Sequence, residues 1–350
     1  MVIVRAMVQS ITRVRETDHG RVQETDRDHK LTKTYSQMLY DNFILLGGSG
    51  FIGKQLAYAL ANRGCTVTIP CRRPHRNRAL LVHPNIRVVE ADVFVLDQLD
   101  SVCQKQQVLI NLIGILHERK RDDFRRIHID FIKSLVDACT RQGIKRVLHL
   151  SALGASQATG TSRYLRSKGE GENLIHTFGQ KELHVTSFQP SVVFGKYDQF
   201  INRFAGILRL CFGFFPLACG QSKLAPVYVG DLVEKIIISI DDKSTYSQRY
   251  TVCGPEVFSL QQILQLLVKA MGLSCRIVSL GNTASKLQAR VLQILPGKLF
   301  TMDNYRSLQT PNVCGEGELC TTSLRQYIQD IGTLFSNKKH YDRFRRQFPS

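Results

Sequence analysis

The sequence predicts an α/β fold in which a doubly wound parallel sheet carries a smaller C-terminal α/β cap. From Asn42 onward, short runs of apolar and β-branched residues alternate with longer segments of helical periodicity. Strand and helix in strict turn produce parallel βαβ units with right-handed crossovers, which cover both faces of a sheet. After about Gln189 the alternation gives way to loops and helices. A chain of 350 residues with 43% hydrophobic content is long enough to build both parts.

The elements of the first part follow one another along the chain. Six strands are expected, at Phe43–Leu46, Thr66–Ile69, Arg87–Glu90, Val108–Leu112, Arg146–Leu150 and His184–Phe188. Helices are expected near Gly50–Arg63, Leu96–Gln104, Asp122–Gln142 and Ser162–Gly179. The run "HERKRDDFRRIHID" (His117–Asp130) mixes acids with bases, which is typical of a solvated helix face.

The second part contains one strongly apolar segment, "FINRFAGILRLCFGFFPLACG", at Phe200–Gly220. Arg203, Arg209 and Pro216 interrupt it, so it is too broken to span a bilayer and is expected to form a helix and a loop over a pocket. An isolated strand and turn are expected at Tyr250–Pro255, followed by a helix at Ser259–Met271.

These changes of pattern divide the chain into four parts. We expect an N-terminal extension at residues 1–40, a nucleotide-binding sheet domain at 41–190, a cap interleaved with the sheet at 191–337 and a basic tail at 338–350. The extension mixes Arg with acids and lacks an apolar run, so it resembles neither a signal peptide nor a transit peptide. The tail, "KKHYDRFRRQF", suits either a membrane or protein surface or a solvated terminus.

The segment "GGSGFIG" connects the first strand to the first helix. Glycines at this spacing let the chain turn sharply, let backbone approach a pyrophosphate and let the helix pack closely on the strand. The helix N-terminus offers its unpaired N–H groups to the same anion. In a strand–turn–helix context the motif predicts dinucleotide binding. The residues expected at the phosphates are Gly47, Gly48, Ser49, Gly50, Phe51, Ile52 and Gly53.

The residues after the second strand indicate which dinucleotide binds. An NAD site places a carboxylate there to accept from the ribose hydroxyls, yet no Asp or Glu occurs between Gly53 and Glu90. The segment "PCRRPHRNR" places Arg72 and Arg73 at this position instead. Because guanidinium groups match a 2′-phosphate in geometry and charge, we expect NADP(H) to be preferred over NAD(H).

Two further segments fit the same cofactor. Asp92 and Val93, after the third strand, are candidates for the adenine end, where Asp92 either accepts from the adenine amino group or caps a helix. The fourth strand ends in "NLIG", whose members Asn111, Leu112, Ile113 and Gly114 are expected to let the nicotinamide half pass.

The segment "SRYLRSKGEGE" contains Tyr164 and Lys168, four residues apart and therefore on one face of a helix. A buried ammonium one turn from a phenol favours the phenolate and lowers its pKa, which makes Tyr164 a candidate proton donor or acceptor. Ser151, thirteen residues before Tyr164, is a candidate to polarise a substrate carbonyl.

Taken with "QPSVVFG" and "PVYVGDLVEKI", these motifs resemble the short-chain dehydrogenase/reductase superfamily, in its NAD-dependent epimerase/dehydratase branch. The similarity runs from about Asn42 to Tyr341. Within that branch, "LSALGA…SRYLRSKGEGE", "VVFGKYDQFINRFAGILRL" and "LFTMDNYRSLQTPNV" resemble the NADPH-binding accessory subunits of respiratory complex I and their bacterial relatives.

The resemblance implies a Rossmann-type sheet and several roles. Pro190, Ser191 and Val192 match the segment that flanks the nicotinamide in the family. Gln189 stands where relatives often have Arg, and the residues around Leu153 lack the extra serines of active sugar epimerases, which argues against nucleotide-sugar chemistry.

Two functions remain open. The resemblance implies an accessory or assembly protein of the respiratory NADH:quinone oxidoreductase that holds NADPH without turnover. The alternative is an active NADPH-dependent oxidoreductase that acts on an apolar carbonyl or a quinone-related substrate through Ser151, Tyr164 and Lys168.

Charge and cysteine content narrow the partners and the compartment. The formal net charge of +18 favours an anionic partner, such as a phosphorylated cofactor, a membrane surface or a respiratory complex. No nucleic-acid module accompanies the charge, so nucleic acid is not expected. The ten cysteines form neither a CxxC nor a metal-ligand spacing, which predicts no metal site and favours a reducing compartment. We expect a bacterial cytoplasmic protein, peripheral on the inner membrane, with the mitochondrial matrix as the alternative.

Overall fold

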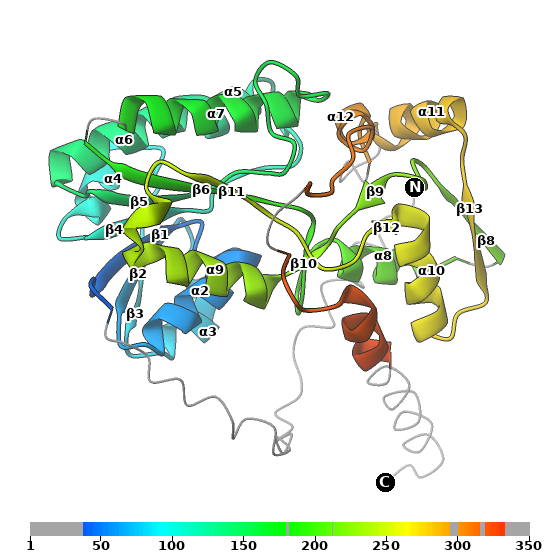
Figure 1. The fold of residues 1–350 in the computed structure, drawn as a ribbon, viewed down its shortest axis with the longest axis horizontal. Coiled ribbons are helices and arrows are strands. Elements are labelled where there is room, and N and C mark those ends of the chain that lie inside the picture. Colours follow the sequence, from blue (N-terminus) through cyan, green and yellow to red (C-terminus); the bar gives the residue numbers. More distant parts are fainter. Residues whose placement is uncertain (1–37, 180–181, 212, 295–299, 316–318, 333–350) are drawn as a thin grey trace, which may run out of the picture. The chain divides into compact units, whose positions relative to one another are not determined.

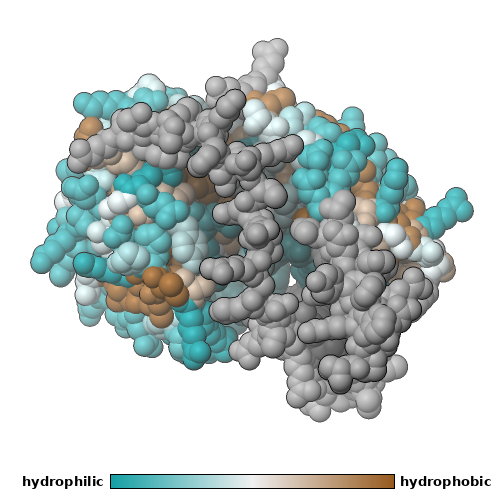
Figure 2. All heavy atoms as spheres, turned by 90° about the horizontal axis from the view of Figure 1, so that it is seen from below, coloured by the Kyte–Doolittle hydropathy of each residue, from teal (hydrophilic) through white to brown (hydrophobic). Residues whose placement is uncertain are grey.

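The computed structural model describes residues 38–179, 182–211, 213–294, 300–315 and 319–332. The basic tail expected at residues 338–350 lies outside the described residues, as does all but the end of the expected extension at residues 1–40. No helix within the described ranges is long and apolar enough to cross a membrane. The face in Figure 2 carries mostly hydrophilic side chains outside the grey atoms, with smaller hydrophobic areas between them.

A parallel sheet of seven strands forms the centre of the first part (Figure 1). Its strands are β1 (Asn42–Leu46), β2 (Thr66–Cys71), β3 (Ile86–Glu90), β4 (Val108–Asn111), β5 (Arg146–Leu150), β6 (His184–Pro190) and β11 (Arg249–Val252). The order across the sheet is β11-β6-β5-β4-β1-β2-β3. Phe43 of β1 lies opposite Val67 on one side and Val108 on the other. From β1 the sheet grows to one side through β2 and β3 and to the other side through β4, β5 and β6. Ligands of such sheets bind at this switch point, at the carboxyl ends of β1 and β4.

Helices cover both faces of the sheet, as Figure 1 shows. On one face lie α2 (Phe51–Ala61), α3 (Arg78–Leu81) and α9 (Val229–Asp241), and on the other α4 (Leu96–Cys103), α5 (Asp123–Arg125), α6 (Phe131–Gln142) and α7 (Arg163–Gly179). Two apolar cores result. Buried residues of α2 and α9 pack on Phe43 and Leu45, while those of α4, α6 and α7 pack on Ile44 and Leu46. The alternation along β1 therefore assigns its side chains to the two cores in turn.

The cap has its own small core. It contains α8 (Ile201–Leu208), β8 (Gly213–Leu217), α10 (Leu260–Ala270), β13 (Cys275–Ser279), α11 (Asn282–Leu292) and α12 (Met302–Ser307). Two short strand pairs join β7 (Val193–Phe194) to β10 (Val227–Tyr228) and β9 (Lys223–Leu224) to β12 (Phe258–Ser259). Apolar side chains of α8, α10 and β13 meet in one cluster, so this part buries a core independent of the sheet.

The fold class and the six expected strands are confirmed, and two local expectations are wrong. The helix expected at Asp122–Gln142 is found over Asp123–Gln142, with a π-helical turn, η3 (Arg126–Asp130), inside it. The second half of the Phe200–Gly220 segment forms strand β8 rather than a loop, because it pairs in parallel with β13. The strand in Tyr250–Pro255 is not isolated, since β11 pairs with β6 and extends the main sheet.

A disulfide joins Cys253, directly after β11, to Cys314. The spacing of the cysteines did not predict it, because 61 residues separate the two partners in the sequence. Folding brings them together where Val313 and Cys314 pack on Leu153, Ala225 and Cys253.

Candidate functional site

The glycine turn between β1 and α2 is shaped by close backbone approaches. Gly47 has φ +80°, and a Cβ there would lie 3.1 Å from the carbonyl carbon of Leu112. A Cβ on Gly53 would lie 2.5 Å from the Gly48 Cα, so the first turn of α2 rests directly on the loop. Only glycine fits these two positions, as the sequence predicts.

The N-terminus of α2 is available to an anion. Gly50 precedes the helix with extended backbone, no side chain caps the helix, and its first turn contains no acidic residue. The first intrahelical bond runs from the Lys54 amide to the Gly50 carbonyl, at 3.0 Å. The earlier amides of the turn, at Phe51 and Ile52, are those that a helix leaves unpaired, so the turn fits a pyrophosphate.

Arg72 and Arg73 follow β2 at the same edge of the sheet, and both are exposed. No ion pair involves them, or Arg76 and Arg78 behind them, within the part of the chain that the structure describes. Four cationic side chains therefore stand near the end of β2 without a neutralising carboxylate among these residues.

Asp92 holds its own loop rather than a helix. Its Oδ1 accepts from the Phe94 amide at 3.2 Å, and its amide donates to Gln98 Oε1 at 2.7 Å. The residue that precedes α4 is Val95, so the alternative in which Asp92 caps that helix is wrong. The Val93 side chain is buried in the core between the sheet and the helices α4 and α6, which leaves only its backbone to face a ligand.

The segment after β4 links the glycine turn to the region around Lys168. Buried Asn111 shapes it, because Asn111 Oδ1 accepts from the Ile113 amide at 3.1 Å. At one end Leu112 touches Gly47, and at the other a Cβ on Gly114 would lie 3.6 Å from Lys168 Nζ. Leu112–Gly114 thus connects two regions that the sequence assigns to opposite parts of one ligand.

Tyr164 and Lys168 lie one turn apart on α7, as expected, but the ammonium does not act on the phenol. Lys168 Nζ donates to the Leu150 carbonyl at 2.6 Å. Burial lowers the pKa of Lys168 to about 8, although the Glu172 carboxylate acts in the opposite direction. Burial raises the pKa of Tyr164 to about 12, and no charge offsets it. The expectation of a lowered phenol pKa is therefore wrong for this arrangement.

Ser151 is also committed elsewhere. Its buried hydroxyl donates to Glu172 Oε2 at 2.7 Å. The same carboxylate accepts from the Gln189 amide at 2.9 Å and lies 3.6 Å from the Arg249 guanidinium. Ser151, Tyr164 and Lys168 occupy one region, but no hydrogen bond joins any two of them in the residues described.

The segment Pro190–Val192 is held by a residue that the sequence did not single out. Asn312 Oδ1 accepts from the Ser191 hydroxyl at 2.6 Å and from the Val192 amide at 3.1 Å. The Leu153 amide donates to the Pro190 carbonyl at 3.0 Å, which ties the segment to the end of β5. A separation of about 120 residues hid this partner from any local pattern.

His128 is a second residue that sequence reasoning missed, because it lies in the run expected to be a solvated face. It is buried in the π-helical turn, and its Nε2 accepts from the Ile115 amide at 3.1 Å. The Nδ1–H therefore donates to Ser167 Oγ, 2.8 Å away. Burial lowers the pKa of His128 to about 3, helped by the Lys168 charge. A neutral imidazole thus fixes the loop after β4 against α7.

A glycine inside α7, Gly171, is the feature of the sequence that could have indicated the contact between His128 and this helix. A Cβ at Gly171 would overlap the His128 carbonyl oxygen, so the π-helical turn and α7 touch through their backbones. Single π-helical turns inside α-helices are frequently found at functional sites.

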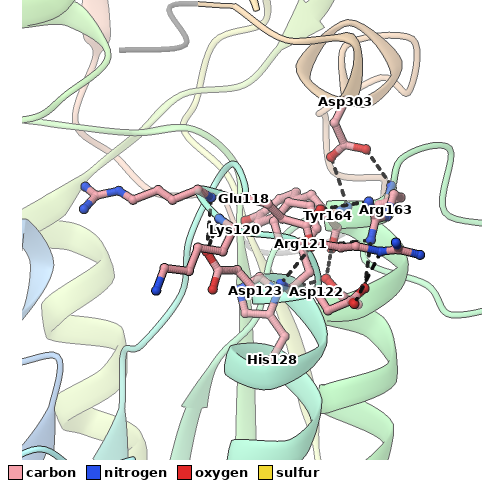
Figure 3. A network of polar contacts seen from close by, with 12 residues as sticks. Glu118, Lys120, Arg121, Asp122, Asp123, His128, Arg163, Tyr164 and Asp303 are labelled. Carbon is pink, nitrogen blue, oxygen red and sulfur yellow. Dashed lines mark hydrogen bonds and ion pairs between the residues drawn. The ribbon is translucent and has the colours of Figure 1, made fainter. Parts of the chain in front are cut away.

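A polar network surrounds the N-terminal end of α7 (Figure 3). Asp303 of α12 accepts from the Arg163 amide at 2.8 Å and from the Tyr164 amide at 3.1 Å. The Arg163 guanidinium pairs with Glu118 at 2.8 Å. Buried Asp123 accepts from the Lys120 amide at 2.8 Å, which orders the loop beside them. Tyr164 therefore lies between the loop after β4 and α12.

Comparison with protein-family models finds one match. Residues 43–253 fit the model described as the NAD dependent epimerase/dehydratase family. The matched region begins in β1 and ends just after β11, so it includes every strand of the main sheet.

Curated proteins with significant similarity include subunits of NADH dehydrogenase. A mitochondrial NADH dehydrogenase [ubiquinone] 1 alpha subcomplex subunit 9 from Arabidopsis thaliana is 26% identical over 79% of this chain and 71% of its own length. The Mus musculus protein of that name is 27% identical over 64% of this chain and 59% of its own length. A ceramide reductase from Caulobacter vibrioides is 26% identical over 55% of this chain and 59% of its own length.

Solved structures share the fold. The crystal structure of gox2253 matches with a TM-score of 0.67 at 14% identity, over 85% of this chain and 98% of that one. A dTDP-glucose 4,6-dehydratase from Bacillus anthracis, solved in complex with NAD, matches with a TM-score of 0.59 at 15% identity, over 77% of this chain and 95% of that one.

Proposed function

The chain belongs to the NAD dependent epimerase/dehydratase family, and from this we propose that it holds NADP(H) and serves as an accessory or assembly protein of a respiratory NADH:quinone oxidoreductase. The observation that carries the proposal is the course of Leu112–Gly114, which touches the glycine turn at one end and approaches Lys168 at the other. A dinucleotide in a sheet of this kind crosses the switch point between the first and fourth strands, where this segment lies.

Each part of the site has an assignment under this proposal. The glycine turn and the first amides of α2 would bind the pyrophosphate, and Asp92 would accept from the adenine. Pro190–Val192 would flank the nicotinamide, and Tyr164 with Lys168 would contact its ribose. The fit rests on the close-packed glycines, which leave backbone donors where a side chain would otherwise stand.

Arg72 and Arg73 support NADP(H) over NAD(H). Both are exposed and follow β2, where a dinucleotide presents its adenosine ribose. With Arg76 and Arg78 they would oppose a 2′-phosphate, whereas the hydroxyl pair of NAD(H) would find no carboxylate in this segment.

Several contacts favour retention of the cofactor over turnover. The Ser151 hydroxyl is engaged by Glu172, the Lys168 ammonium by the Leu150 carbonyl, and the pKa of Tyr164 is raised to about 12. Two of the groups that would activate a carbonyl are thus engaged by the protein itself, and the third keeps its proton. The similarity to NADH dehydrogenase subunits supports a respiratory complex as partner, and the name "mitochondrial" that these relatives carry supports the matrix over the expected bacterial cytoplasm.

An active NADPH-dependent oxidoreductase is the second candidate, favoured by Tyr164 and Lys168 on one face of α7. Bound NADPH would supply a hydride to a carbonyl substrate. Tyr164 would donate the proton, and Lys168 would have to leave the Leu150 carbonyl to support it. An apolar substrate gains less support than expected, because Ile201 and Leu208 of the Phe200–Gly220 segment are buried in the core of the cap.

Mass spectrometry of nucleotide released from the freshly purified protein tests the proposal. We expect NADPH or NADP⁺ in near-equal molar amount with the protein. A ligand present at about one hundred times its dissociation constant adds about 2.7 kcal/mol to the free energy of unfolding, so removal of the nucleotide should lower the melting temperature. No nucleotide and an unchanged melting temperature would contradict the proposal.

The Tyr164→Phe variant separates the two candidates. It should retain the nucleotide, because the aromatic ring remains and only the hydroxyl is lost. If an added carbonyl or quinone oxidises NADPH bound to the wild type and does not oxidise NADPH bound to this variant, the second candidate is correct. Equal inertness of both proteins supports the accessory role.

A further inference from the structure

A single segment of the cap, which we call the strap (Thr301–Cys314), lies against the residues around Tyr164. Its first turn is α12, whose Asp303 accepts from the amides of Arg163 and Tyr164 (Figure 3). Asn304 donates to the Leu116 carbonyl at 3.5 Å. The strap therefore contacts both sides of Tyr164, namely the start of α7 and the loop after β4.

The same strap continues along the end of the sheet. The Thr161 hydroxyl bonds to Thr310 Oγ1 at 2.7 Å, and Ser307 bonds to Ser162 at 2.7 Å. Asn312 then holds Ser191 and Val192. Ser162 and Ser191 are buried and the other partners are exposed or partly buried, and each of these hydrogen bonds alone adds little stability.

The strap ends in a covalent bond to the sheet. Cys314 is joined to Cys253, which follows the edge strand β11. The disulfide fixes one end of the strap to the sheet, while Tyr305 of α12, near the other end, is buried with Ala218 and Ala289 of the cap. The bond joins two segments that lie 61 residues apart in the sequence, and without it this end of the strap is attached through hydrogen bonds such as those of Asn312.

We propose that the Cys253–Cys314 disulfide is a redox-sensitive clamp that keeps the strap closed over Tyr164. A thiolate of a dithiol reductant attacks the sulfur of Cys314, which is half-buried, and displaces the thiolate of Cys253, which is fully buried. The second thiol of the reductant then attacks the mixed disulfide. The reductant is released as its own disulfide, and Cys253 and Cys314 remain in the protein as thiols. Reduction then withdraws Asp303 from the start of α7.

The chemistry of the chain suits a reversible bond. Eight other cysteines of the described residues form no disulfide, as in proteins of reducing compartments, where a disulfide is usually transient and catalytic or redox-sensing. The inference goes beyond the proposed function, since it concerns access to Tyr164 whether or not a dinucleotide is bound.

Hydrogen exchange at the amides of Arg163 and Tyr164 tests the clamp, because both amides donate to Asp303. The full chain is compared in its oxidised form and after treatment with dithiothreitol, with exchange read at single residues by mass spectrometry. We expect exchange at these two amides to rise at least tenfold on reduction. Amides of β5, such as Val147 and Leu148, should not change.

Three variants complete the test. Cys314→Ser should exchange as the reduced protein does, with or without reductant. Cys275→Ser, which removes a free half-buried thiol, should behave as the wild type. Asp303→Ala should expose the same two amides in both redox states.

The following outcomes would overturn the proposal. Equal protection of Arg163 and Tyr164 in the two redox states would show that the strap does not depend on the bond. Exposure of β5 together with these amides would show a general structural disulfide instead. Quantitative alkylation of both cysteines in protein purified without reductant would show that the bond does not form. None of these results bears on nucleotide release, so the two proposals fail independently.

Discussion

Gly53 is required by the contact between the start of α2 and the glycine turn. A Cβ there would lie 2.5 Å from the Gly48 Cα and 2.6 Å from the Gly47 carbonyl oxygen. We expect Gly53→Ala to displace the turn, to lower the free energy of unfolding by about 1–3 kcal/mol and to weaken nucleotide binding at least tenfold. Urea unfolding and nucleotide titration measure the two effects.

Gly206→Ala is the matched control for Gly53. Gly206 lies inside α8, and a Cβ there would meet no atom within 4 Å. Alanine favours a helix over glycine, so this variant should gain up to about 1 kcal/mol and bind nucleotide normally. Similar losses in both variants would refute the steric argument.

Arg72 and Arg73 determine the choice of dinucleotide if our assignment is correct. Hydrogen bonds to a charged group contribute about 1.5–3 kcal/mol each, so Arg72→Ala combined with Arg73→Ala should weaken NADPH binding by about a hundredfold or more. Binding of NADH should hardly change. Fluorescence titration with both nucleotides measures the ratio, and Arg290→Ala, exposed on α11, provides the control. An unchanged ratio would remove the assignment.

His128 predicts how stability depends on pH. Its pKa in the folded protein is about 3, below the ordinary value of 6.5, so the unfolded chain binds the extra proton as the pH falls. The contribution of the neutral imidazole to the free energy of unfolding is complete above pH 6.5 and is lost as the pH falls towards 3. Between pH 4 and 6, each such histidine adds a slope of about 1.4 kcal/mol per pH unit.

The His128→Gln variant isolates this contribution. Urea unfolding from pH 4 to 6 should show a slope smaller than that of the wild type by about one proton, whatever the variant loses in absolute stability. His75→Gln, at an exposed position, should keep the wild-type slope. His149 and His176 also have lowered pKa values, so both variants should keep the positive slope of stability with pH that these two residues contribute.

At the scale of elements, the π-helical turn η3 and α7 form one unit. They meet where Gly171 faces the His128 carbonyl, and His128 in turn bonds to Ser167. We expect Gly171→Ala to force the two elements apart and to lower the free energy of unfolding by at least about 1–3 kcal/mol. Thr177→Ala, exposed on the same helix, should change it by no more than about 0.5 kcal/mol. Equal melting temperatures of the two variants would contradict this account.

Elements with a local signal could be predicted from the sequence. The strands β1 to β6 carry compact apolar runs, and the expected bounds differ from those found by two residues or fewer. The π-helical turn could not be predicted, because its cause is a contact with Gly171, more than forty residues later. Strand β8 was likewise missed, since its partner β13 lies about sixty residues further along the chain.

The same distinction applies to the candidate site. The glycine turn and the Tyr164–Lys168 spacing are local patterns, and the structure places both at the carboxyl ends of the strands. The partners of these residues are not local. Asp303 and Asn312 reach the start of α7 and Ser191 from the cap. Ser151 bonds across elements to Glu172 of α7, and Lys168 bonds to the Leu150 carbonyl of β5, so neither bonds to Tyr164.

At the scale of the whole molecule, the last strand of the main sheet follows the first elements of the cap in the sequence. The chain leaves the sheet after β6, builds β7, α8, β8 and further cap elements, and returns to add β11 beside β6. The family match ends at residue 253, the cysteine that follows β11 and carries the disulfide. Sheet and cap are therefore joined by hydrogen bonds, by the chain itself and by a covalent bond.

The late arrival of β11 matters during synthesis. When the ribosome has released only the first 190 residues, β6 is an unprotected edge whose amide and carbonyl groups can pair with any neighbouring chain. About sixty more residues must emerge before the seventh strand covers it. A nascent chain of this length thus passes through a window of aggregation, which ends when Arg249–Val252 docks.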